Sequence, residues 1–109
     1  MKTSGLVLLA LLLLASRMAA GELYGTITDG GKPLASGVKV EVGVSGNVYS
    51  TETDKFGSYR VFVKEKGKCT LTLSVRDQSP SVGLFSYDKS TRYDWILETK
   101  DAKLSLRRR

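Results

Sequence analysis

Apolar and polar residues alternate along most of the chain after residue 20. In GVKVEVGV, residues 37–44, every second position is valine, and Lys39 and Glu41 lie between them. The same period of two recurs in SYRVFV, residues 58–63, and in KCTLTLSV, residues 68–75. This alternation, rich in β-branched and aromatic residues, is typical of strands with one buried face. No stretch after residue 20 has the apolar spacing of a helix with caps at both ends.

Turn-forming residues separate the alternating segments. DGGKP, SGN, DKFG, EKGK, RDQSP and DKS each combine Gly, Pro, Asn, Asp or Ser, which satisfy or permit the backbone geometry of turns. Short strands at intervals of about ten residues predict an all-β sandwich or barrel. The expected strands lie near residues 22–28, 37–44, 47–53, 58–64, 68–75, 81–87 and 92–98. The tail KLSLRR alternates again, so it could pair with 92–98 as an eighth strand.

The first twenty residues have the order of a secretory signal. Lys2 is followed by an apolar run from Leu6 to Ala15 and then by small residues. A spanning helix needs about 20 apolar residues, so an uncleaved anchor is the weaker alternative. We expect residues 1–20 to be a cleavable signal peptide and residues 21–109 one domain, periplasmic or extracellular. No membrane span is expected after cleavage.

Two motifs together resemble a known family. GTITDGGKPLASGVKVEV, residues 25–42, is followed by TETDKFGSYRVFV, residues 51–63, with Asp54, Gly57 and Tyr59 at the spacing of the carboxypeptidase regulatory-like domain. The resemblance covers residues 23–75. It implies a transthyretin-like (prealbumin-like) antiparallel β-sandwich of seven to eight strands, here a small stand-alone exported member. Such domains accompany catalytic or transport domains, so the resemblance implies a non-catalytic module.

The residue types limit the possible chemistry. The chain has no His, which excludes Ser-His-Asp and Cys-His sites and any His-based zinc site. The related transthyretin-like hydrolases depend on His residues and on a C-terminal Tyr-Arg-Gly-Ser, and this chain ends SLRRR. Cys69, the single cysteine, alternates with Leu71 and Leu73 and is expected in the core. We therefore expect no enzyme, no cofactor and no metal.

Two carboxylate pairs at even spacing are the candidates for acid–base chemistry. They are Glu52 with Asp54, and Asp94 with Glu98, and a solvated strand face is the favoured interpretation of both. Calcium at Asp54 is disfavoured because its turn offers too few oxygen ligands. Asp54 and Gly57 are expected to form a structural turn, with Asp54 bonded to free amides and Gly57 at positive φ.

Surface aromatic residues are the candidate ligand-binding residues. Tyr24 and Phe62 are expected opposite the core-facing residues of their strands, and Tyr49 could join them. An exposed aromatic platform could stack on sugar rings, or the residues could simply pair across the sheet. Trp95 with Tyr93 is expected in the core.

Charge adds little to this interpretation. Without Lys2 and Arg17, fifteen basic residues stand against 11 acidic ones, and three of them form the terminal run Arg107–Arg109. That run is interpreted as protection of an edge strand against pairing, with binding of an anionic surface as the alternative. No basic stripe with interleaved aromatics suggests nucleic acid. The expected function is a module for protein–protein or cell-envelope interaction with an unknown partner, and the alternative is a carbohydrate-binding domain for a polysaccharide.

Overall fold

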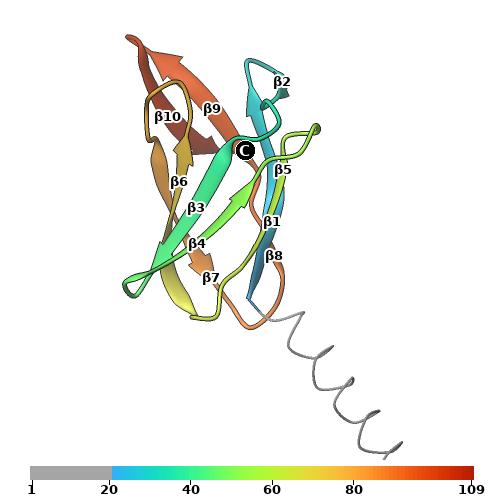
Figure 1. The fold of residues 1–109 in the computed structure, drawn as a ribbon, viewed down its shortest axis with the longest axis vertical. Helices are drawn as coiled ribbons and strands as arrows, with labels where there is room; N and C mark the ends of the chain where they lie inside the picture. The colour runs from blue at the N-terminus through green and yellow to red at the C-terminus, as the bar shows by residue number, and fades with distance from the viewer. Residues whose placement is uncertain (1–20) are drawn as a thin grey trace, which may run out of the picture.

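A computed structural model of the chain describes residues 21–109, which form two packed β-sheets (Figure 1). The predicted signal segment, residues 1–20, lies outside the described residues. The strands are β1 (Glu22–Asp29), β2 (Lys32–Pro33), β3 (Lys39–Val44), β4 (Asn47–Glu52), β5 (Ser58–Phe62), β6 (Gly67–Ser74), β7 (Ser81–Ser86), β8 (Thr91–Arg92), β9 (Trp95–Lys100) and β10 (Lys103–Arg108). Within residues 21–109 there is no helix long and apolar enough to cross a bilayer.

The strands form two sheets with different topologies. Sheet II is a four-stranded antiparallel sheet in the order β4-β3-β6-β7. Sheet I has β1 at its centre, with β5 on one side, β9 and β10 on the other, and β2 and β8 also paired with β1. β1 runs parallel to β8 and to β9, and every other strand pairing is antiparallel. The predicted all-β, transthyretin-like sandwich is confirmed, with this one parallel seam added.

The tail pairs as its alternation predicted. Lys103–Arg108 lies antiparallel to Trp95–Lys100, so Arg107 and Arg108 belong to the edge strand β10 and Arg109 follows it. Arg107 forms an ion pair with Glu98, and the Arg108 guanidinium lies 4.6 Å above the ring of Tyr93. The terminal arginines are therefore held against the sandwich.

The core lies between the sheets and is made by the alternating residues. It contains seventeen buried hydrophobic side chains, of which Leu23 is the first in the sequence and Leu104 the last. Trp95 is 2% exposed and stacks on Tyr93 at 5.6 Å between ring centroids. Cys69 is buried among these residues, as its alternation predicted.

Two side chains cap backbone groups along the side where β7 and β10 form sheet edges. Gln78 donates from Nε2 to the Ala102 carbonyl and accepts from the Leu104 amide, at 2.9 and 2.8 Å. The Tyr93 hydroxyl accepts from the Phe85 amide and donates to its carbonyl, at 3.2 and 3.0 Å. Both contacts occupy groups that another strand would need for pairing.

Candidate functional site

A polar groove lies on the outer face of sheet I, where β1 passes between β5 and β8. Its volume is about 410 Å³. The lining residues are Tyr24, Gly25, Thr26, Thr51, Glu52, Asp54, Ser58, Tyr59, Arg60 and Arg92. We call it the arginine groove, because Arg60 lies on one side of Tyr24 and Arg92 on the other. β1, β5, β8 and the end of β4 all contribute residues, so the groove exists only in the folded sheet.

Strand register places the two arginines in one row. Tyr24 pairs with Arg60 of β5 on one side and with Arg92 of β8 on the other. Neighbouring strands lie about 4.8 Å apart, so the two arginine Cα atoms are about 10 Å apart across the sheet. Both side chains are on the solvent side and are more than half exposed.

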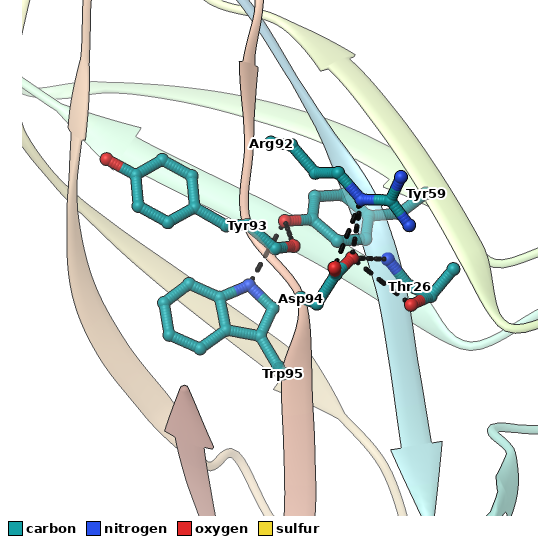
Figure 2. Close-up of polar contacts among 6 residues, drawn as sticks. All are labelled: Thr26, Tyr59, Arg92, Tyr93, Asp94 and Trp95. Atoms are coloured by element: carbon teal, nitrogen blue, oxygen red, sulfur yellow. Dashed lines mark hydrogen bonds and ion pairs between the residues drawn. The ribbon is translucent and has the colours of Figure 1, made fainter. Parts of the chain in front are cut away.

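Each arginine is oriented by one carboxylate. The Arg60 Nε lies 3.2 Å from a Glu22 oxygen, and the Arg92 Nε lies 3.1 and 3.0 Å from the two Asp94 oxygens. Within residues 21–109, no side-chain hydrogen bond involves a terminal nitrogen of either guanidinium group, and Figure 2 shows those of Arg92 pointing away from Asp94. Each arginine is thus fixed at Nε and keeps donors for a ligand.

Asp94 replaces part of the backbone ladder between β1 and the β8–β9 segment. Its Oδ1 accepts from the Thr26 amide at 2.9 Å and from the Thr26 hydroxyl at 3.2 Å (Figure 2). Partial burial would raise the pKa of the Asp94 carboxyl, but these bonds and Arg92 lower it, and the net pKa is below its ordinary value. The carboxylate therefore stays ionised and orients Arg92.

Buried aromatic residues form the base beneath this row. The Trp95 indole donates to the Tyr59 hydroxyl at 3.1 Å, and that hydroxyl donates to the Tyr93 carbonyl at 2.7 Å (Figure 2). Burial raises the pKa of the Tyr59 phenol well above its ordinary value, so it acts as a neutral donor. Gly25 is required here because a Cβ would overlap the Tyr93 carbonyl oxygen.

The turn beside the groove is built on Asp54 and Gly57. The Asp54 carboxylate accepts from the amides of Phe56 and Ser58, each at 2.9 Å. Gly57 has φ +72° and donates its amide to the Asp54 carbonyl at 3.1 Å. Asp54 is therefore occupied by its own turn although it lines the groove.

The three aromatic candidates lie in different surroundings. Tyr24 is half-buried in the arginine groove, and Phe62 lies on the same face of sheet I, 47% exposed. Tyr49 belongs to sheet II and pairs with the buried Val42, so it does not share that face. Its hydroxyl donates to Glu65 at 2.6 Å. The structure thus brings Tyr24 and Phe62 to one face and separates Tyr49 from them.

The carboxylate pairs are separated by their partners. Asp94 faces Thr26 and Arg92, whereas Glu98 pairs with Arg107. Glu52 lines the groove, and Asp54 is held in its turn. Within residues 21–109, no three His, Cys, Asp or Glu side chains are grouped to hold a metal ion.

Sequence reasoning did not find Arg60 and Arg92. Alternation places each of them on the solvent face of its strand, but a single exposed arginine does not indicate a binding site. What makes them a pair is the position of β8 beside β1, a parallel pairing between segments 68 residues apart. No local pattern in the sequence reveals that pairing.

Comparison with known proteins identifies the fold. No protein-family model matches the sequence, and no curated protein matches it. The structure is similar to that of Klebsiella pneumoniae 5-hydroxyisourate hydrolase, with a TM-score of 0.60 and 17% sequence identity. The match covers 82% of this chain and 98% of that chain. Identity at this level shows a shared transthyretin-like fold.

This comparison corrects the functional expectation. The predictions of a non-catalytic interaction module, of a carbohydrate-binding alternative and of no enzyme are wrong. They rested on the step from this fold to an accessory domain and on the absence of His and of a C-terminal Tyr-Arg-Gly-Ser, whereas the similar solved structure is that of a hydrolase. A fold of this kind carries catalytic sites as well as accessory modules, so function has to be argued from the groove.

Proposed function

We propose that the chain is a small-molecule hydrolase that holds a carbonyl- or carboxylate-bearing substrate in the arginine groove. The observation that carries the proposal is the row Arg60–Tyr24–Arg92, in which each guanidinium group is ion-paired through Nε with a carboxylate and each side chain is more than half exposed. Guanidinium groups recognise oxyanions through paired donors. A groove of about 410 Å³ suits a small ring-shaped molecule.

The role of each groove residue in hydrolysis follows from whether its side chain already has hydrogen-bond partners. Arg60 and Arg92 bind the carbonyl oxygen and stabilise the negative charge that develops on it. Glu52 takes a proton from water, because Asp54 is bonded within its turn and Asp94 is bonded to Thr26 and Arg92. The water oxygen then bonds to the carbonyl carbon. The bond to the leaving group breaks, and Glu52 returns the proton to that group.

Activity should be tested on 5-hydroxyisourate and on a panel of small cyclic amides and esters, followed by ultraviolet absorbance. The first substrate is chosen because the fold is shared with a 5-hydroxyisourate hydrolase. Arg60→Ala or Arg92→Ala should lower kcat/KM by about a hundredfold or more. Glu52→Gln should lower kcat by a similar factor.

Arg107→Ala is the matched control for these variants. Arg107 also pairs with a carboxylate, Glu98, but does not line the groove. It should retain the activity of the unmodified chain. Absence of turnover on the whole panel, or equal losses from Arg92→Ala and Arg107→Ala, would overturn the proposal.

We also propose the finer family and location. The chain is an exported member of the carboxypeptidase regulatory-like group, which is supported by the motif from Thr51 to Val61 and by the apolar run Leu6–Ala15. Mass spectrometry of protein recovered outside the cytoplasm tests this. A mature chain should begin close to Gly21, and a chain that retains Met1 would contradict export by cleavage.

A further inference from the structure

Most of the exposed large apolar side chains lie at one end of the sandwich. Five such side chains are found in residues 21–109, and four of them belong to the start of β4, the end of β5 and the end of β7 with the residue after it. These strand ends lie toward the end of the sandwich where β1 begins, the lower end in Figure 1. We call these four the basal girdle: Val48 (62% exposed), Phe62 (47%), Phe85 (49%) and Tyr87 (48%). The fifth, Phe56, is in the turn at the opposite end.

The basal girdle surrounds this end instead of forming one flat patch. Phe62 is on the outer face of sheet I, near the end of β5. Val48 and Phe85 are on strands of sheet II, and Phe85 stacks on Tyr87, which follows β7. A flat partner could cover one sheet face only. A soft interface that the end of the sandwich dips into would cover both.

Exposed lysines accompany the basal girdle. Lys64, Lys66, Lys68 and Lys89 all lie in the loops and strand ends of this region, and all are exposed. Its loops contain two carboxylates, fewer than the four lysines: Glu65 accepts hydrogen bonds from Tyr49 and Asn47, and Asp88 is 2.7 Å from Lys66. The excess charge available to a partner at this end is therefore positive.

The chain enters the sandwich at this same end. The Val63 amide donates to the Gly21 carbonyl at 2.9 Å, beside the first residues of β1. In the sequence, five residues separate Gly21 from the apolar run Leu6–Ala15. Before cleavage, a bilayer that takes up this run would therefore lie next to the basal girdle.

From these observations we infer that the basal girdle and its four lysines dock on the surface of an anionic phospholipid bilayer. Aromatic rings settle at the level of the lipid headgroups. Lysines next to them are attracted to the negative surface potential. Apolar side chains that reach just below the headgroups add binding in proportion to their buried area. The docking would hold the arginine groove, on the flank of the sandwich, open to solvent.

The first test is co-sedimentation of residues 21–109 with vesicles. The chain should bind phosphatidylglycerol–phosphatidylcholine vesicles and bind pure phosphatidylcholine vesicles at least tenfold more weakly. Replacement of Lys64, Lys66, Lys68 and Lys89 by Gln should weaken binding to anionic vesicles more than tenfold, because each lysine near the surface contributes about a fivefold factor. Replacement of Lys32, Lys55, Lys100 and Lys103 at the opposite end removes the same charge and should have little effect.

The aromatic contribution has its own pair of variants. Phe62→Ser together with Phe85→Ser should weaken vesicle binding several-fold, whereas Phe56→Ser should not. Equal losses from the two lysine sets would show nonspecific attraction and overturn the inference. Absence of binding to anionic vesicles, with circular dichroism confirming folded protein, would overturn it as well.

The second test uses the full chain in vesicles and hydrogen exchange. Residues 62–68 and 85–90 should be protected in anionic vesicles relative to neutral ones, and residues 29–33 and 100–103 should be unchanged. Equal exchange of the two ends in both lipids would contradict the inference even if the apolar run keeps the chain on the vesicle.

Discussion

Replacement of Gly57 by alanine is expected to lower the free energy of unfolding by about 3–4 kcal/mol. Gly57 has φ +72°, a conformation that costs an L-residue about 1–2 kcal/mol. A Cβ there would lie 2.6 Å from the Ile27 carbonyl oxygen and 2.9 Å from the Leu34 amide nitrogen. Relief of this overlap must weaken the backbone bonds Ile27–Gly57 and Leu34–Ile27, at about 1 kcal/mol each.

Gly31→Ala separates the two contributions. Gly31 has φ +82°, and a Cβ there meets nothing within 4 Å, so the expected loss is only about 1–2 kcal/mol. Urea unfolding can be followed by the fluorescence of Trp95, the single tryptophan, which is 2% exposed in the folded chain. Equal losses in the two variants would refute the argument that backbone packing against Gly57 matters.

Three further outcomes follow from other contacts. Asp94 has a lowered pKa in the folded chain, so its contribution to stability is present above about pH 4 and is lost as pH falls further. With Asp94→Asn, the free energy of unfolding should fall less steeply as pH drops below about 4. An unchanged fall would contradict a stabilising role of the Asp94 carboxylate. Tyr93→Phe should cost about 1 kcal/mol in urea unfolding, because the Phe85 amide and carbonyl lose their partner. Burial raises the pKa of the Cys69 thiol, so a disulfide reagent should label it only on unfolding, and rapid labelling of the native chain would place it at the surface.

The local sequence pattern was sufficient to predict most of the strands and many of the buried residues. Alternation placed Cys69 and Trp95 inside and predicted that the tail would pair as a further strand. These features depend on the parity of side chains along one strand. Tyr49 shows the limit of that reasoning: its strand has Val48 on one face and Tyr49 on the other, and only pairing with β3 decides which face is inside.

The candidate site depended on information that no single strand carries. Arg60 and Arg92 become neighbours of Tyr24 through one antiparallel and one parallel pairing. The parallel pairing joins the first strand to the last third of the chain, and no turn signal connects them. The resemblance to an accessory domain then favoured the wrong functional class, because a fold alone does not determine whether a site is catalytic.

The central position of β1 also bears on how the chain reaches its folded state. β1 is the first described strand to be synthesised, yet its partners on one side, β8 and β9, are synthesised near the end of the chain, with Thr26 bonded to Asp94 across 68 residues. Closing a loop of this size precedes any gain from the pairing, and such non-local topologies fold in milliseconds to seconds. Sheet I cannot be completed until Asp94 and β9 have been synthesised. A chain still emerging from the ribosome would therefore keep one edge of its first described strand unpaired.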